Sequence, residues 1–518
     1  MLNSVRFPIL VGLALLTCAN TSNAQSRIVV PAGGDLQAAI DRARGGDVIV
    51  LAAGATYVGN FILPFTSAGS SYITITSDAD PGRFRSGDRV APADGQWMPT
   101  LRSPNSSPTL ATAPGAHHWR LQWLKFAANA GGFGDIITLG DGSSAQRELA
   151  TVPHDFVLDG LLLAGDPVHG QKRGIALNSG MTTIRNSDIR NIKAAGQDSQ
   201  AICGWNGPGP YLIENNYLEA AGENVMFGGA DPSISGLVPS DIIFRHNYVT
   251  KPLEWRQDGS PWTVKNLFEL KNATRVLIEW NLFEYSWAAA QTGYAILFTP
   301  LNQDHTAPWT VVSDVTFQYN VVRHAASAIN MLGYDYMATS QQTRRVTIRQ
   351  NLFYDIDASR WGGDGRFFML GDEPADITVD HNTIFQSGTF LLLYGQEEGR
   401  PRRVTNMRVT NNLAFHNEYG ILGEEYGFGR VAIEAYLSNP DIRANVLSGG
   451  DPGRYPSGNF FPAPQEFRSE FVNVETDDYR LRATSRFRTA ATDRSMLGAN
   501  VEVLRRGMPR GDTPIGRR

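Results

Sequence analysis

Eight copies of one short phrase run through the middle of the chain and limit its possible folds more than any other feature. Each copy has an apolar residue, two varied residues, an Asn, one further residue and a second apolar residue, as in Ile213-Glu-Asn-Asn216-Tyr-Leu218. The Asn residues recur every 30 to 39 positions, as Asn216, Asn247, Asn281, Asn320, Asn351, Asn382, Asn412 and Asn445. A period of this length is typical of proteins built from stacked repeats.

The Asn of each phrase predicts a sharp bend between two short strands, because Asn tolerates the left-handed backbone of tight bends. Stacked Asn amides can also hydrogen-bond along a column, so the repeat predicts an Asn ladder. Ser187 and Gly160 occupy the bend position in two looser upstream copies. A helical solenoid is the competing interpretation, and the strand-like spacing of the apolar residues argues against it. Two apolar columns should line the interior, one running from Ile213 to Ile442 and the other from Leu218 to Leu447.

A third apolar run precedes each next phrase and predicts a third strand in every coil. The runs are Gly174–Asn178, Ala201–Trp205, Asn224–Gly228, Leu267–Lys271, Ala295–Thr299, Ala328–Leu332, Arg366–Leu370 and Thr389–Leu393. Three strands per coil make three parallel sheets around one core, and each coil needs its neighbours to bury its apolar face.

With these features the chain resembles the pectin-lyase-like superfamily of right-handed parallel β-helices. The opening is also similar to that superfamily's amino-terminal cap, because Asp35 can cap a short amphipathic helix over Leu36–Ala43. The resemblance implies an all-β, single-stranded, right-handed parallel β-helix of three sheets with a short N-terminal capping helix. It does not choose an activity, since this fold hosts lyases, hydrolases, isomerases and non-catalytic adhesins.

The sequence divides into four predicted regions. Residues 1–24 read as a secretory signal, with Arg6, an apolar run over Ile9–Leu16 and a small-residue cleavage site at Ser22-Asn-Ala24. Residues 25–110 should form the N-terminal cap and first coils, 111–450 the β-helix, and 451–518 a C-terminal cap and tail. We therefore expect an exported protein, either periplasmic or extracellular.

The two Cys residues bear on lipid attachment and disulfide bonds, and the charge balance bears on which partners the protein can bind. Lipid attachment at Cys18 is disfavoured because the residue before it is Thr17, and Cys203 is then the one Cys of the mature chain, with no disulfide partner. The net charge of −5 leaves no basic stripe for nucleic acid. No run after the signal is long and apolar enough to span a membrane. We expect a monomer.

Candidate chemistry centres on Leu267-Phe-Glu-Leu-Lys271. Side chains of a strand alternate between its two faces, so Glu269 and Lys271 should point outward together in the middle of the third-strand sheet. In the superfamily this sheet commonly forms the floor of the sugar-binding groove. The alternative is that the two residues form an exposed ion pair of little energetic value. Arg323 is a third catalytic candidate.

Residues framing the third-strand sheet are candidates for binding a polysaccharide or oligosaccharide. They are Trp205, Asn178, Glu223, Tyr294, Asn330, His305 and Asp335. Glu269 and Asp231 are the candidate ligands for Ca²⁺, which would neutralise a substrate carboxylate. The sequence has no Asp-rich cluster of the kind found in pectate lyases.

Three functions fit these residues. A lyase acting on uronate sugars by β-elimination would use Lys271 as the base and Glu269 as a metal or substrate ligand. A glycoside hydrolase would pair Glu269 with Glu223 or Asp335 as two carboxyl groups. A non-catalytic carbohydrate-binding or surface β-helix would need neither reaction. We favour the lyase.

Overall fold

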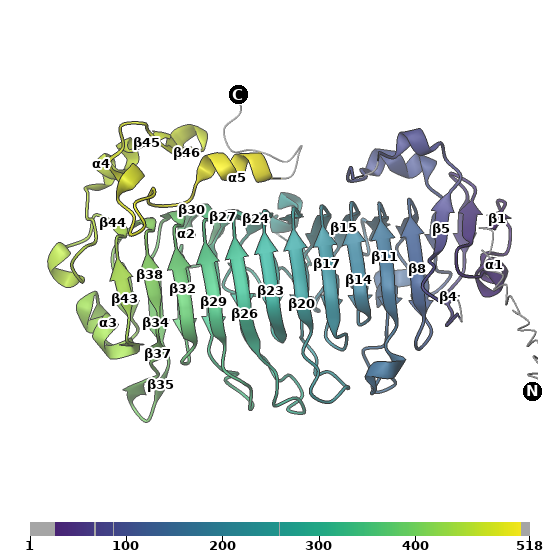
Figure 1. Cartoon of the computed structure of the whole chain (residues 1–518), viewed down its shortest axis with the longest axis horizontal. Coiled ribbons are helices and arrows are strands. Elements are labelled where there is room, and N and C mark those ends of the chain that lie inside the picture. Colours follow the sequence, from purple (N-terminus) through teal and green to yellow (C-terminus); the bar gives the residue numbers. More distant parts are fainter. Residues whose placement is uncertain (1–25, 67–68, 86, 258, 509–518) are drawn as a thin grey trace, which may run out of the picture.

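The computed structural model describes residues 26–66, 69–85, 87–257 and 259–508. The chain winds as a right-handed parallel β-helix whose coils each contribute one strand to sheets A, B and C. In Figure 1 sheet A faces the viewer with its strands pointing up, and sheet B runs along the upper edge. The predicted fold class is confirmed.

Sheet A contains the strand that precedes each Asn. Its strands are β1 (Arg27–Val30), β2 (Val48–Leu51), β5 (Ile73–Ser77), β8 (His117–Gln122), β11 (His154–Asp159), β14 (Gly180–Arg185), β17 (Gly209–Glu214), β20 (Ser240–Arg245), β23 (Ala273–Glu279), β26 (Val312–Gln318), β29 (Arg344–Arg349), β32 (Ala375–Asp380), β37 (Val404–Thr405), β38 (Arg408–Thr410), β42 (Leu437–Ser438) and β43 (Asp441–Arg443).

Sheet B contains the strand that follows each Asn. Its strands are β3 (Thr56–Val58), β6 (Thr100–Arg102), β9 (Lys125–Ala127), β12 (Leu162–Ala164), β15 (Asp188–Ile192), β18 (Tyr217–Ala220), β21 (Tyr248–Thr250), β24 (Leu282–Ser286), β27 (Val321–Ala325), β30 (Leu352–Ile356), β33 (Thr383–Gln386), β39 (Leu413–Phe415) and β44 (Val446–Ser448).

Sheet C contains the third strand of each coil. Its strands are β4 (Phe61–Leu63), β7 (Leu110–Thr112), β10 (Asp135–Leu139), β13 (Arg173–Leu177), β16 (Gln200–Gly204), β19 (Val225–Phe227), β22 (Phe268–Leu270), β25 (Tyr294–Phe298), β28 (Ser327–Leu332), β31 (Phe368–Gly371), β34 (Leu391–Tyr394), β40 (Ile421–Gly423) and the antiparallel β41 (Gly427–Phe428). The short pairs β35 (Gln396–Glu397) with β36 (Arg400–Pro401) and β45 (Phe471–Asn473) with β46 (Asp478–Leu481) lie outside the three sheets.

The predicted apolar columns form the core. Ile213, Phe244 and Ile278 are paired in register on sheet A, and Leu218, Val249 and Phe283 are paired in register on sheet B. These side chains are at most 1% exposed and belong to one continuous core. Stacking of the coils therefore supplies the burial that no coil has alone.

The Asn ladder is also confirmed. Asn320 Nδ2 donates to Asn351 Oδ1 at 3.2 Å and to the Ile278 carbonyl at 2.9 Å, and Asn320 Oδ1 accepts from the backbone N–H of Asn281 at 3.0 Å. The same bonds repeat from Asn216 to Asn445. The column extends one rung further, because Asn445 Nδ2 donates to Asn459 Oδ1 at 3.0 Å.

The left-handed backbone lies one residue earlier than we predicted. The ladder Asn residues do not have positive φ, whereas the residues directly before them do, for example Trp280 (φ 58) and Tyr319 (φ 53). The Asn amide is needed inside, where it bonds to neighbouring coils, so the preceding residue makes the turn. The same offset corrects the upstream copy, in which Gly160 (φ 66) makes the turn and Leu161, bonded to Ser187 Oγ, holds the ladder position.

Short helices lie at the ends of the solenoid, in one connection between strands and in the segment after the last coil. Helix α1 (Leu36–Arg42) closes the N-terminal end, and its predicted N-cap is confirmed because Asp35 Oδ1 accepts from Ala38 N at 2.9 Å. Helix α2 (Ala358–Trp361) lies in the connection between β30 and β31, and α3 (Arg430–Tyr436) packs against β40 and β41. Helix α4 (Pro464–Ser469) and α5 (Val501–Gly507) belong to the segment that follows the last coil.

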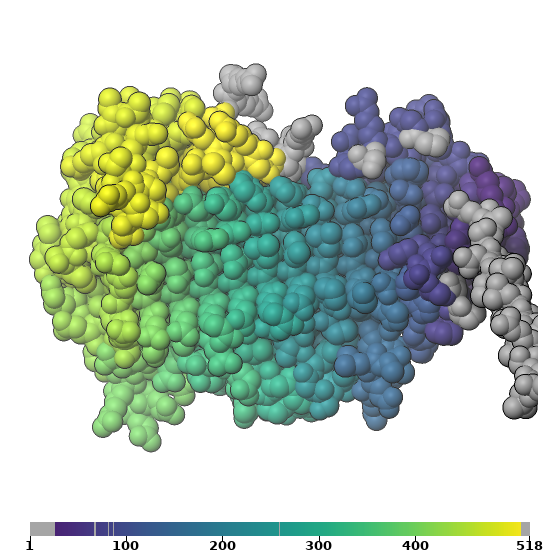
Figure 2. Space-filling view, viewed as in Figure 1, coloured from purple at the N-terminus to yellow at the C-terminus, as the bar shows by residue number. Residues whose placement is uncertain are grey.

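Residues 460–508, here called the C-terminal segment, turn back over sheet B (Figure 1). A second core joins the two, with buried Leu352 and Phe385 from sheet B against Phe467, Leu497 and Leu504. The segment also runs back along the ladder corner, with contacts from Thr492 to Asn411, Ser495 to His381, Ala499 to Thr383, Asn500 to Gln350 and Gly507 to Trp280. In Figure 2 the C-terminal segment, in yellow, lies at the upper left, and the first described residues, in purple, lie at the other end of the molecule.

Several predictions about export concern residues 1–25, which lie outside the described residues. Cys203 is a buried free Cys, and burial raises the pKa of its thiol to about 12. Across the described ranges, no helix has the length and apolarity needed to cross a membrane.

Candidate functional site on the outer face of sheet C

Glu269 and Lys271 lie together on the outer face of sheet C, as predicted. Lys271 Nζ is 3.5 Å from Glu269 Oε1, and Asn266 Nδ2 donates to Glu269 Oε2 at 2.9 Å. The Glu269 side chain is 2% exposed and that of Lys271 is 18% exposed. The pair is therefore not the exposed ion pair of the alternative interpretation, because Glu269 is withdrawn from water and Lys271 covers it.

A continuous line of polar contacts leads toward this pair across sheet C. Arg173 Nη1 is 3.0 Å from Asp135 Oδ1, and Arg173 Nε donates to Gln200 Oε1 at 3.1 Å. Gln200 Nε2 then donates to Glu223 Oε2 at 2.8 Å. Arg173, Gln200 and Glu223 thus lie in register at the starts of successive strands of sheet C and form an outward polar row. The next residue of this row in register is Asn266.

Glu223 is the buried acidic residue of this row. It is 1% exposed, and Lys265 Nζ lies 3.3 Å from its Oε1 and 2.6 Å from Asp198 Oδ1. Burial raises the pKa of Glu223, and the neighbouring Glu269 carboxylate raises it further. A buried carboxyl group with a raised pKa is typical of acid–base sites.

Several buried polar atoms on this face have no partner within the described structure. They belong to Asn178 (Nδ2), Asn266 (Oδ1) and Asn330 (Oδ1). Buried polar groups are almost always hydrogen-bonded, so each unpaired group calls for an explanation. Hydroxyl groups of a bound sugar or ordered water molecules would provide the missing partners.

Arg323 does not belong to this site, which corrects the prediction. It lies on β27 of sheet B, 8% exposed, where Nε donates to Glu284 Oε2 at 2.6 Å and Nη1 donates to Tyr354 OH at 2.8 Å. The sequence contained the information to place it. Arg323 stands three residues after ladder Asn320, and residues at that offset, such as Glu219 and Glu284, face outward on sheet B.

Two of the predicted binding residues are structural in their contacts. Asn178 is fully buried, and its Oδ1 accepts from the backbone N–H groups of Trp205 and Asn206 at 3.0 and 2.9 Å. Asp335 accepts from Asn302 N and Met337 N, both at 2.8 Å, and so holds two loops together. The Asp335 carboxylate is therefore committed to the backbone rather than free for a substrate.

The remaining predicted residues lie around the same face. Trp205 is partly exposed, with the Arg173 guanidinium 5.1 Å from its ring centroid. Tyr294 begins β25 and is 4% exposed, and Asn330 follows Leu297 in register on β28. His305 is exposed and lines a small hollow with Asn302, Asp335 and Tyr336.

The predicted calcium ligands are Glu269 and Asp231. Asp231 Oδ2 accepts from Asp304 N, Thr306 N and Thr306 Oγ1 at 3.1, 2.8 and 2.7 Å, which occupies that oxygen. Within the described ranges, no three Asp, Glu, His or Cys side chains are grouped so as to hold a metal ion. Calcium binding stays a prediction, and no chemical step below depends on it.

Comparisons with known proteins agree with the fold. Neither a protein-family profile nor a curated protein matches the chain. Among solved structures, the family 6 alginate lyase AlyGC is 13% identical with a TM-score of 0.50, over 91% of this chain and 58% of that one. A mannuronic acid specific family 6 lyase from human gut microbiota is 12% identical with a TM-score of 0.53, over 86% of this chain and 93% of that one.

The catalytic unit of a family 87 α-1,3-glucanase from Streptomyces thermodiastaticus also has a similar structure. It is 14% identical with a TM-score of 0.50, over 82% of this chain and 68% of that one. At these identities the likeness establishes the fold alone. The chain spans 58% of the length of AlyGC.

Proposed function

We propose that this chain cleaves a uronate-containing polysaccharide by β-elimination on the outer face of sheet C. The observation that carries the proposal is the Glu269–Lys271 pair, set among buried polar atoms of Asn266 and Asn330 that have no protein partner within the described structure. Two proteins of similar fold are lyases of alginate and of mannuronic acid polymers. This supports the class of substrate and of reaction.

Each step has a candidate group. Lys271 Nζ, as the neutral amine, removes the proton next to the uronate carboxylate and becomes the ammonium. The electron pair of the broken C–H bond forms the new C=C bond, and the glycosidic C–O bond breaks with its electron pair leaving on the oxygen. Engagement of Glu269 by a substrate hydroxyl would free the Lys271 amine from its carboxylate partner. Glu223, whose pKa is raised by burial and by Glu269, can give the leaving oxygen a proton.

The cations on this face can neutralise substrate carboxylates. Lys265 Nζ lies beside Glu223, in the same part of the sheet as Lys271. Arg173 lies three strands away from β22, about 14 Å at the usual spacing between strands. It would therefore contact a different sugar residue of the same polysaccharide, lying along the axis of the solenoid.

Hydrolysis is the second candidate, because one observation favours it. Hydrolysis needs two carboxyl groups, and Glu223, whose pKa is raised by burial and by Glu269, would act as the general acid beside Glu269. The two reactions differ in product, since only elimination leaves an unsaturated sugar that absorbs ultraviolet light.

The test uses purified protein with alginate, pectate and glucuronan, each with and without Ca²⁺. Elimination predicts ultraviolet-absorbing product, and the Lys271→Ala variant should lose at least about 10²-fold in rate with little change in melting temperature. Arg349→Gln, an exposed substitution on sheet A, is the control and should keep full activity. New reducing ends without the absorbance would establish hydrolysis instead. Full activity of Lys271→Ala would remove the pair from the mechanism.

A further inference from the structure

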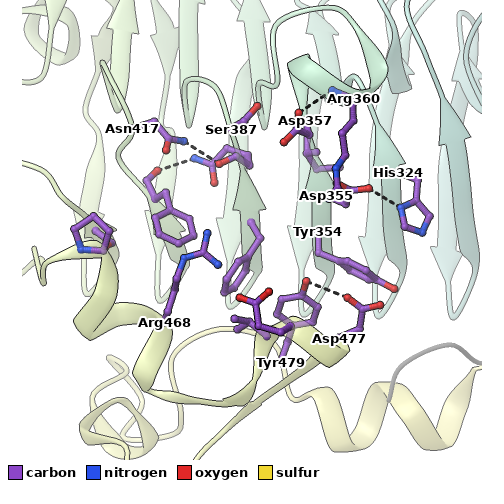
Figure 3. A pocket seen from close by; sticks show the side chains of 18 of the residues that line it. His324, Tyr354, Asp355, Asp357, Arg360, Ser387, Asn417, Arg468, Asp477 and Tyr479 are labelled. Atoms are coloured by element: carbon purple, nitrogen blue, oxygen red, sulfur yellow. Dashed lines mark hydrogen bonds and ion pairs between the residues drawn. The ribbon is translucent and has the colours of Figure 1, made fainter. Parts of the chain in front are cut away.

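A cleft lies on another face of the molecule, between sheet B and the C-terminal segment. It encloses about 750 Å³, within the range of small-molecule sites. Strands β27, β30, β33, β39 and β44 form one wall, and α4 with residues 474–479 forms the other. Figure 3 shows Asp477, Tyr479 and Arg468 of the C-terminal segment facing His324, Tyr354 and Asp355 of sheet B.

The sheet wall presents a fixed carboxylate. His324 Nδ1 lies 2.7 Å from Asp355 Oδ2, Arg360 Nη1 donates to Asp355 Oδ1 at 2.9 Å, and Trp361 Nε1 donates to Asp355 Oδ2 at 3.1 Å. Burial alone would raise the pKa of Asp355, but the hydrogen bonds from His324 and Trp361 outweigh it and lower the pKa. Asp355 is thus held ionised and immobile.

The opposite wall presents a second carboxyl group in the reverse condition. Asp477 lies on the C-terminal segment with φ 57, and Tyr479 OH donates to it at 3.4 Å. Burial raises the pKa of Asp477, against the lowering effect of Arg323 and His324, and Asp355 adds to the rise. Asp355 and Asp477 therefore offer carboxyl groups from opposite walls of the cleft, and each can accept hydrogen bonds from the hydroxyl groups of a sugar.

Gln386 gives an independent sign that the cleft holds a ligand. Its side chain is 5% exposed and lines the cleft, and Nε2 donates to the Phe415 carbonyl at 2.6 Å. Its Oε1 is buried with no partner within the described structure. A buried acceptor without a partner is destabilising, and a ligand that donates a hydrogen bond to Oε1 would remove that cost.

The composition of the walls selects the chemical class of that ligand. Four carboxyl groups line the cleft (Asp355, Asp357, Glu475 and Asp477) against two guanidinium groups (Arg360 and Arg468), so a polyanion such as a uronate chain is disfavoured. A metal ion is not indicated, since the described acidic and His side chains form no group of three suited to one. Neutral hydroxyl groups satisfy Gln386 Oε1 and the carboxylates together, because each hydroxyl donates one hydrogen bond and accepts others.

We propose that this cleft binds a short neutral oligosaccharide, through Gln386 and Asp477 on its two walls. The site is separate from the face of sheet C and does not depend on the reaction proposed there. It would hold a neutral stretch of a mixed polysaccharide, or a neutral glycan beside the charged one.

Isothermal titration calorimetry of the full chain with cellotriose, laminaritriose, xylotriose and mannotriose tests the proposal, with trimannuronate as the charged comparison. At least one neutral trisaccharide should bind at millimolar concentration or below. Gln386→Met and Asp477→Asn should each weaken that binding about tenfold or more, the value of one good hydrogen bond. Asn tolerates the left-handed φ of residue 477, so the second variant keeps the fold even where the first does not.

Two controls locate the binding. Glu502→Gln, an exposed substitution on α5 outside the cleft, should leave the affinity unchanged. Lys271→Ala should also leave it unchanged, which separates this site from the face of sheet C. The proposal is overturned if none of the four neutral trisaccharides binds, if Asp477→Asn binds as tightly as the wild type, or if only Lys271→Ala loses the binding.

Discussion

At some turns between strands, a single side chain makes many of the hydrogen bonds that hold the backbone, and Lys251 is the clearest case. It is fully buried just after β21, and its Nζ donates to Ala220 O at 2.8 Å, Ala221 O at 2.9 Å, Gly222 O at 2.6 Å and Asn224 Oδ1 at 2.8 Å. These oxygens belong to the turn that carries Glu223. One side chain thus fixes the backbone beneath a candidate catalytic group.

Replacing Lys251 with Met should therefore destabilise the protein by on the order of 3 kcal/mol, because four buried oxygens lose a shared donor. Urea unfolding followed by circular dichroism measures the change. Lys172→Met, at a partly exposed position, should change the unfolding midpoint little. Equal stability of the two variants would show that the turn oxygens find other donors.

At the scale of elements, five consecutive strands of sheet A, from β20 to β32, carry a second column of left-handed residues near their starts. Asp241, Arg275, Asp314, Arg345 and Asp376 have φ between 54 and 58 and alternate in charge from coil to coil. Arg345 meets Asp314 with two contacts of 2.6 Å, and Arg275 meets Asp241 at 2.7 and 2.8 Å. Alternating charges favour the observed stacking, because each charged residue lies in register with opposite charges on the neighbouring coils.

The column predicts a pH dependence. The hydrogen bonds from Arg345 are the largest cause that lowers the pKa of Asp314, which falls to about 2. A depressed carboxyl pKa contributes stability above the unfolded value of about 4, and the contribution disappears as the pH falls through about 2. The pair is partly exposed, so its contribution is under about 1 kcal/mol. Arg345→Gln should raise the Asp314 pKa in an NMR titration, whereas Arg494→Gln should leave it unchanged.

Elements with a periodic signal could be predicted from the sequence, and elements without one could not. The Asn ladder, both apolar columns and the Glu269–Lys271 pair follow from spacing and alternation. The last rung, Asn459, was missed because it lies 14 residues after Asn445 instead of a full coil. The burial of Glu269 also could not be foreseen, because it depends on side chains from neighbouring coils and loops that vary in length.

At the scale of the whole molecule, the C-terminal segment joins coils that are distant along the solenoid. The contacts of residues 492–507 extend from the coil of Asn411 to the coil of Trp280. In a simple repeat protein each coil depends on its immediate neighbours. Here the second core around Phe385 and Leu504 links one segment to several coils, and no repeat in the sequence signals that contact.

Leu504→Asp should detach α5, because the buried side chain, 0% exposed, cannot accept a charge. Trypsin should then cleave after Arg494 or Arg505 at least about tenfold faster, since cleavage follows the population of the opened segment. The β-sheet circular dichroism at room temperature should not change. Glu502→Gln on the same helix is the control, and unchanged cleavage of Leu504→Asp would show that α5 is held by other contacts.

The position of the C-terminal segment also has a consequence for the order of synthesis. Residues 460–508 are translated after every coil that they cover, so the coils can stack during elongation while sheet B still lacks its outer wall. The cleft between Asp355 and Asp477 can form only after the C-terminal segment has been synthesised and has packed onto sheet B. A nascent or prematurely ended chain would carry the face of sheet C in finished form, yet it would have no sugar site on sheet B.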